Sequence, residues 1–139
     1  MRKVWTAWLA AVWLLQGCAG SGASQEAVDC GTKLSAKSWR LVMFDNDPVT
    51  LTPPVTLRIS NGKVSGFDGC NRFFGEAVVT PTALDFGTLG STRRFCRGTA
   101  GAMEKKVLEM LRDKKWWQFD ERGRLVIFDD AHRLIFTAE

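Results

Sequence analysis

Turn-forming residues divide most of this chain into short apolar segments, and this spacing limits its fold more than any other feature. Asn61-Gly62 gives the clearest turn, because a type I′ hairpin needs positive φ at both of its central residues. Clusters of Asp, Asn, Pro and Gly interrupt the chain at several other places. Strands this short, joined by tight turns, pair in antiparallel order. The expected strands cover 38–44, 55–60, 63–68, 73–80, 83–86, 116–120, 125–128 and 134–137.

One segment has a helical period instead. From residue 99 to about 115 the apolar side chains recur at the spacing of an amphipathic helix, with Thr99 as the expected N-cap and Glu104 near the start. Basic residues gather at its end, as the helix dipole favours. Its expected apolar face consists of Met103, Val107, Leu108, Met110 and Leu111. We therefore predict an α+β fold, a small antiparallel β-barrel or strongly curved sheet with one main helix over about 99–115 packed on it.

Length and charge exclude some classes of function. With 139 residues, of which 45% are hydrophobic and 24% are charged, the chain has room for one globular domain. The formal net charge is +4, and it falls to +2 when Arg2 and Lys3 at the start of the chain are left out. An excess this small does not indicate nucleic-acid binding, so we expect no nucleic-acid partner.

The first residues are typical of a lipoprotein leader. Met1-Arg2-Lys3 is a short positive segment, and the twelve apolar residues 4–15 would span only ~18 Å of a ~30 Å hydrocarbon core, too little for a transmembrane helix. Such a run fits the apolar region of a signal peptide. Leu15-Gln16-Gly17-Cys18 resembles the lipobox of bacterial lipoproteins, in which the Cys becomes the lipidated N-terminus. The alternative is an ordinary secretory leader with a chance Cys.

A lipidated Cys18 divides the chain into three parts. Residues 1–17 are then the signal peptide, 18–37 the lipidated N-terminus with a flexible tether, and 38–139 the folded domain. The acyl chains would hold the protein on a membrane. Ala19, rather than Asp, follows the Cys, which resembles the default for sorting to the outer membrane. We therefore expect a lipid-anchored protein of the bacterial outer membrane that faces the periplasm.

Two segments in the middle of the chain form a specific pattern. Residues 66–75 read GFDGCNRFFG, and residues 92–96 read TRRFC. Together they resemble the META domain family, the HslJ-like heat-shock lipoproteins, whose pattern is GxxGCNxxxG followed by a Thr…Cys segment before the helix. The resemblance covers roughly residues 38–137. It implies a periplasm-facing or secreted protein, linked to heat shock and to tolerance of certain antibiotics, with no established catalysis.

The motif residues also have structural interpretations. Gly66, Gly69 and Gly75 suit a bulge and a tight bend where backbone approaches backbone. Asn71 can bond the neighbouring backbone and hold that bend, and Thr92 opens the second motif segment. A ligand site at the motif is the alternative interpretation.

The motif cysteines are the expected disulfide. Because an oxidising compartment favours disulfides and each resembling segment contributes one Cys, we expect a Cys70–Cys96 bond, with Cys30 outside it as a thiol. Two buried thiols that pack as small apolar groups are the alternative. Either motif Cys could pair with His132 as nucleophile and base, but no catalytic motif accompanies them. We expect no enzyme, no metal site and no cofactor.

Basic residues flank the motif cysteines at Arg72, Arg93, Arg94 and Arg97. A disulfide would gather them in one region, and guanidinium groups bind phosphate in a bidentate manner. The hypothesis is an anion-binding face directed at the membrane or at a partner. The alternative is a solvated face, with Arg72 and Arg93 paired to Asp68, Asp85 or Glu76.

Three classes of function remain. The first is a non-catalytic envelope lipoprotein that contributes to stress or antibiotic tolerance of the outer membrane. The second is a pilotin-like module that binds lipid or a secretion-system component, which rests on fold-level analogy. An enzyme is the third. An apolar cavity open through the barrel mouth would favour the second class, and a core filled by side chains would favour a partner-binding or purely structural role. We expect a monomer, with the membrane and one unidentified protein or lipid as partners.

Overall fold

The computed structural model of the protein describes residues 24–139, with side chains from residue 28 onward. Its helices are α1 (Ser24–Ser35) and α2 (Gly98–Met110). Its strands are β1 (Trp39–Phe44), β2 (Asp47–Pro48), β3 (Thr56–Ser60), β4 (Lys63–Phe67), β5 (Arg72–Val79), β6 (Ala83–Phe86), β7 (Gly90–Ser91), β8 (Asp113–Phe119), β9 (Leu125–Phe128) and β10 (Arg133–Ala138). Neither helix in this part of the chain is long and apolar enough to span a membrane.

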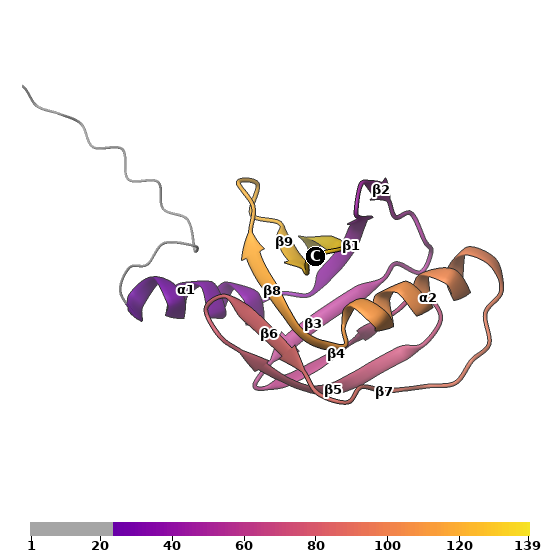
Figure 1. Ribbon diagram of the computed structural model, residues 1–139, viewed down its shortest axis with the longest axis horizontal. Coiled ribbons are helices and arrows are strands. Elements are labelled where there is room, and N and C mark those ends of the chain that lie inside the picture. Colours follow the sequence, from indigo (N-terminus) through magenta and orange to yellow (C-terminus); the bar gives the residue numbers. More distant parts are fainter. Residues whose placement is uncertain (1–23) are drawn as a thin grey trace, which may run out of the picture.

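The strands form one antiparallel sheet that closes on itself (Figure 1). Neighbouring strands follow the order β1–β3–β4–β5–β6–β8–β9–β10, and β10 pairs with β1 from Trp39 opposite Ala138 to Phe44 opposite Leu134. Residues 24–139 therefore contain an eight-stranded barrel, which confirms the predicted α+β fold with one main helix packed on it and selects the barrel over the strongly curved sheet. The two short strands that the sequence did not predict, β2 and β7, pair with β1 and β5 at the margins.

The hairpin between β3 and β4 has the predicted turn. Asn61 and Gly62 have φ angles of 52° and 70°, the positive values that a type I′ turn requires. Pairing runs from Ser60 opposite Lys63 to Thr56 opposite Phe67, and β5 continues the sheet with Arg72 opposite Phe67. Because side chains alternate along a strand, this register decides which residues face outward. The outer face of β3, β4 and β5 carries Thr56, Ser65, Phe67, Arg72 and Phe74.

Large side chains fill the described barrel interior. Trp39, Phe73 and Phe136 are each 1% exposed. Helix α2 packs against this core through the predicted apolar face: Val107, Met110 and Leu111 are buried, and Met103 and Leu108 are partly buried against them. Figure 1 shows α1 and α2 at opposite ends of the molecule's long axis.

Both ends of α2 differ from the prediction. The N-cap residue is Arg97, in extended conformation and without a side-chain cap, rather than Thr99. The helix ends at Met110 rather than near residue 115, because residues 113–115 belong to β8. There Lys114 and Lys115 lie opposite Asp85 and Leu84 of β6. Hydrogen bonding to β6 therefore makes residues 113–115 part of a strand, although their local sequence pattern predicts helix.

The prediction of a flexible tether over residues 18–37 is wrong for the part that the structure describes. Residues 24–35 form α1, and Cys30 and Leu34 are buried in the core at 2% and 1% exposure. The indole N–H of Trp39 donates a hydrogen bond of 3.0 Å to the carbonyl oxygen of Leu34, which fixes the end of α1 against β1. The folded unit therefore begins well before residue 38. Residues 1–17 and Cys18 lie outside the described residues.

Candidate anion-binding groove

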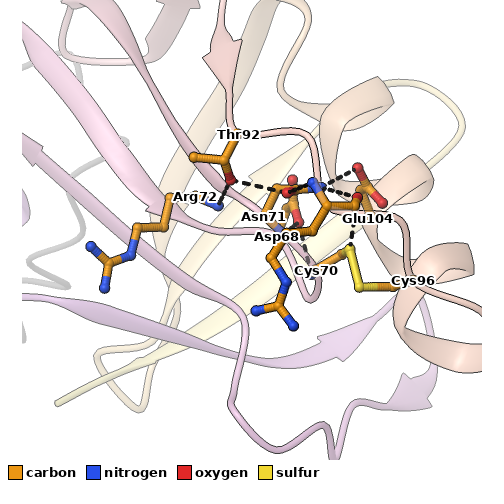
Figure 2. Close-up of a disulfide and its surroundings, with 8 residues drawn as sticks. Asp68, Cys70, Asn71, Arg72, Thr92, Cys96 and Glu104 are labelled. Atoms are coloured by element: carbon orange, nitrogen blue, oxygen red, sulfur yellow. Dashed lines mark hydrogen bonds between the residues drawn. A yellow bond between two sulfur atoms is a disulfide. The ribbon is translucent and has the colours of Figure 1, made fainter.

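The disulfide of the motif joins two segments that are far apart in the sequence. Cys70, in the turn between β4 and β5, is bonded to Cys96, just before α2, with 5.8 Å between their Cα atoms (Figure 2). This is the pair that the sequence predicted. The loop 92–97 has no helix or strand of its own beyond β7, so the bond is one of the contacts that determine its position.

Asn71 is the second of these contacts, and its amide uses its full hydrogen-bonding capacity. Its Oδ1 accepts from the hydroxyl of Thr92 at 3.0 Å and from the backbone N–H of Arg94 at 2.7 Å. Its Nδ2 donates to the carbonyl oxygen of Arg94 at 3.0 Å and to Oε1 of Glu104 in α2 at 2.9 Å. Figure 2 shows this amide between Thr92 and Glu104. Asn71 therefore connects three elements, which is more than the local bend that the sequence predicted for it.

Asp68 holds the turn from the inside. The residue is fully buried, and its Oδ1 accepts from the backbone N–H groups of Cys70 at 2.9 Å and Asn71 at 2.7 Å. Its other oxygen, Oδ2, is buried without a hydrogen-bond partner. The backbone N–H of Asp68 in turn donates to the carbonyl oxygen of Asn71. Asp68 is thus an element of the turn and forms no ion pair with Arg72 or Arg93, the arginines that the sequence offered as its partners.

Two glycines are required by the close packing here. A Cβ on Gly66 would collide with the carbonyl oxygen of Thr56 and with the ring of Phe73. Gly69 has a φ of 107°, which side-chain-bearing residues rarely adopt, and it faces α2 at Ala100 and Met103. The third motif glycine, Gly75, leaves space that the side chain of Leu89 fills. The predicted close approaches of backbone are therefore present.

A groove of about 1270 Å³ lies over this turn on the outer face of the sheet. One wall is the 52–54 loop with Pro53 and Pro54, and the other includes Thr92, Cys96 and the start of α2. The floor contains apolar side chains, among them Phe67 and Phe74 of β4 and β5. The lining includes two arginines, Arg72 and Arg94, and no carboxylate. A groove with this lining suits a ligand that combines an anionic group with an apolar part.

The four arginines are exposed, and no ion pair involves any of them within residues 28–139. The alternative of carboxylate pairing is therefore wrong for the described residues: Asp68 is buried in the turn, and Glu76 pairs with Lys63 at 3.0 Å. Arg72 and Arg94 line the groove, whereas Arg93 and Arg97 do not. The guanidinium of Arg97 lies 6.0 Å from the ring centroid of Phe95.

His132 and the motif cysteines are separate in the structure. His132 lies between β9 and β10, where its Nδ1 is 2.9 Å from Oδ2 of Asp45. A backbone hydrogen bond from Arg133, helped by His132, lowers the pKa of Asp45. Cys70 and Cys96 are bonded to each other, so neither offers a thiol to this imidazole. Cys30, which the sequence left as a thiol, is itself disulfide-bonded, and that part of the prediction is wrong.

Comparison with known proteins gives a family match over a region that includes both motif segments. The family model of the META domain matches residues 32–139. The chain belongs to the META domain family. No curated protein matches it. An NMR structure of a protein from Burkholderia xenovorans is similar, with 27% identity and a TM-score of 0.62 over 78% of this chain and 87% of that one. A second NMR structure has 22% identity and a TM-score of 0.65, covers 76% of this chain and 91% of that one, and has a similar fold.

Within this META domain, the sequence prediction missed Asp68 and Glu104 as parts of the motif site. Both are acidic residues that bond motif atoms and not basic side chains. Asp68 could have been found from its position, because an Asp two residues before a motif Cys can accept backbone N–H groups in an Asx turn. Nothing local marks Glu104, which reaches Asn71 only because α2 packs beside the turn. No group of three or more His, Cys, Asp or Glu that could hold a metal occurs among the described residues.

Proposed function

We propose that this META domain protein is a non-catalytic, lipid-anchored envelope protein that binds anionic groups and contributes to stress or antibiotic tolerance of the outer membrane. The observation that carries the binding role is the groove lined by Arg72 and Arg94 without any carboxylate. Guanidinium groups without an acidic partner remain available to a phosphate or carboxylate from outside the protein.

The polar groups of the motif support binding rather than catalysis. Asn71 spends its amide on Thr92, Arg94 and Glu104, and Asp68 accepts two backbone N–H groups. A nucleophile or general base needs a reactive atom that can reach substrate. These side chains instead hold the loop that presents Arg94 to the groove.

The lipid anchor rests on the sequence around Cys18, because this residue lies outside the described part of the chain. Cys18 is the one cysteine of the sequence besides Cys30 and the Cys70–Cys96 pair. Its sulfur can form a thioether with lipid or a disulfide but not both, so the lipid anchor is directly testable. We expect labelled palmitate to enter the wild-type protein and not the Cys18→Ser variant, and we expect a lipoprotein signal-peptidase inhibitor to block cleavage. A non-reduced N-terminal peptide with the mass of a disulfide, or label that persists in Cys18→Ser, would contradict the anchor.

The groove has its own test in cells under envelope stress. Arg72→Glu with Arg94→Glu reverses both charges of the lining, and we expect tolerance to fall towards that of cells lacking the protein. Arg112→Glu with Arg122→Glu is the matched control, because both residues are exposed and lie outside the groove lining. Equal tolerance in the two double variants, at equal protein levels, would remove the groove from the function.

The pilotin-like alternative needs a place for lipid or for a partner segment. Trp39, Phe73 and Phe136 occupy the described barrel interior, which supports an external groove over an internal lipid cavity. Within that alternative, Phe67 and Phe74 would receive the apolar part of the ligand. Loss of binding in an unlipidated protein would favour the anchor as the sole membrane attachment.

A further inference from the structure

The loop 92–97 presents a side chain that the groove does not use. Phe95 is 85% exposed, the highest exposure of any large hydrophobic side chain among the described residues. It does not line the groove. A single exposed apolar residue is ordinary on a protein surface, so exposure alone decides nothing.

The unusual feature is how firmly this loop is held. The residue before Phe95, Arg94, has both its backbone N–H and its carbonyl oxygen bonded to the amide of Asn71. The residue after it, Cys96, is in the disulfide with Cys70. Further back, the N–H of Thr92 donates to the carbonyl oxygen of Arg72 at 3.0 Å. Phe95 is therefore exposed on a fixed backbone. Because the loop is already ordered, insertion of Phe95 into another surface costs little conformational entropy of the backbone.

The sequence on both sides of Phe95 is basic and contains no acidic residue. The sequence has no Asp or Glu between Asp85 and Glu104, and this stretch contains Arg93, Arg94 and Arg97. Glu104 itself is bonded to Asn71. Most of the other residues in the stretch are Gly, Ser, Thr and Ala, whose small side chains let a flat surface approach the backbone. One aromatic ring among unpaired guanidinium groups matches the interface of an anionic bilayer, where phosphates lie above an apolar layer.

We propose that the loop 92–97 docks on anionic phospholipid, with Phe95 inserted at the headgroup–acyl boundary and with Arg93, Arg94 and Arg97 on the phosphates. This inference rests on the proposed anion binding: the loop shares Arg94 with the groove, and a phospholipid headgroup is named as the source of the anionic group. A bilayer fits Phe95 better than an acidic protein does, because a lone ring needs no pocket of complementary shape in a fluid interface.

The position of the loop adds a constraint on orientation. Figure 1 shows the loop between β7 and α2 at one end of the long axis and α1, where the chain enters the domain, at the other. If the loop contacts the membrane and the N-terminal side is attached to it, both ends of the domain lie at the membrane. The long axis is then parallel to the membrane surface. A domain held only by its N-terminal side has no such preference.

Vesicle binding tests the loop without the lipid anchor. The chain from residue 18 onward, with Cys18→Ser, contains the whole described domain and is mixed with vesicles of phosphatidylglycerol and phosphatidylethanolamine or of phosphatidylcholine alone. We expect binding to the anionic vesicles, weakened by added salt, and little binding to phosphatidylcholine. Phe95→Ser should weaken partitioning about 10-fold, and Arg93→Glu with Arg97→Glu by about 25-fold or more, since each basic residue near such a surface contributes ~5-fold.

Matched controls separate the loop from general surface chemistry. Trp116→Ser removes an aromatic side chain that is 47% exposed on β8, and Arg112→Glu with Arg122→Glu reverses two exposed charges elsewhere, so both should bind like the parent. In Phe95→Trp, brominated lipid should quench more fluorescence than in the parent. Absence of binding to anionic vesicles, or equal binding by Phe95→Ser and the parent, would overturn the proposal. Neither result depends on Cys18, so failure of the lipid anchor remains distinguishable.

Discussion

Two regions of the barrel carry exposed or half-buried basic side chains, and only one of the two pairs some of them with acidic groups. Around β8, β9 and β10, two basic side chains have acidic partners: Arg124 pairs with Asp120 at 2.7 Å and Lys115 with Asp129 at 3.4 Å. Around the motif turn, Arg72 and Arg94 have none within the described residues. There the acidic groups bond the backbone and an amide instead, as Asp68 and Glu104 do.

This difference separates charges that stabilise the fold from charges that remain available to a ligand. A paired, half-buried arginine contributes to the free energy of unfolding, whereas an unpaired exposed one contributes little. At the motif, stability comes from the disulfide and the amide of Asn71. Stability and binding therefore reside in different side chains of one site, and mutations should affect them independently.

The largest effect on stability is expected from Asn71→Leu. The substitution leaves Arg94 N–H, Arg94 C=O, the Thr92 hydroxyl and Glu104 without the amide that bonds them. We expect the free energy of unfolding, measured by urea denaturation, to fall by about 3–5 kcal/mol, since each net hydrogen bond contributes roughly 1 kcal/mol. Asn46→Leu, at an exposed asparagine with one side-chain bond to Arg133, is the control and should cost less than about 1 kcal/mol. An equal decrease in the free energy of unfolding in the two variants would contradict a central stabilising role of Asn71.

A moderate, pH-dependent effect is expected from Asp120→Asn at the opposite region. Burial raises the pKa of Asp120, but hydrogen bonds from the backbone and side chain of Arg124 and from the backbone of Arg122 outweigh it, so the pKa lies below its ordinary value. A lowered carboxyl pKa stabilises the fold above the unfolded pKa of about 4, and that stability is lost as the pH falls through the folded value.

Asp120→Asn should therefore lower the free energy of unfolding by about 1 kcal/mol at neutral pH, because it removes the ion pair with Arg124 but keeps an acceptor for the turn. The difference from wild type should shrink below about pH 4. A difference that stays constant from neutral to acid pH would contradict a contribution from the ionised carboxylate.

The smallest effect on stability is expected at the arginines of the groove. Arg72→Ala and Arg94→Ala should each change the free energy of unfolding by less than about 0.5 kcal/mol, because no acidic partner is lost. Arg124→Ala, which loses its pair with Asp120, should cost about 1 kcal/mol in the same urea titration. A larger loss at Arg72 or Arg94 than at Arg124 would reverse the comparison and make the groove arginines structural.

Local chemistry was sufficient to predict most of the fold. The strand β3, the Asn61-Gly62 turn and the strand β4 follow from side-chain alternation and from the φ angles that one turn type requires. The apolar face of α2 follows from the helical spacing of its apolar residues, which is also a pattern between near neighbours in the sequence. The Cys70–Cys96 pair came from the resemblance to the META motif, since spacing alone does not determine which cysteines meet.

The tertiary structure decided what depends on distant partners. Helix α1 has few apolar residues to mark it, and it is ordered because Leu34 and the indole of Trp39 meet at the core. The end of α2 depends on β6, which pairs with the residues that follow the helix. Whether an arginine is paired also depends on which carboxylates the fold brings near it. The sequence by itself determined most of the strands, the Asn61-Gly62 turn and the apolar face of the helix, because these depend on neighbours along the chain. Only the closed barrel could leave Arg72 and Arg94 without acidic partners and hold Phe95 exposed, because segments far apart in sequence meet there.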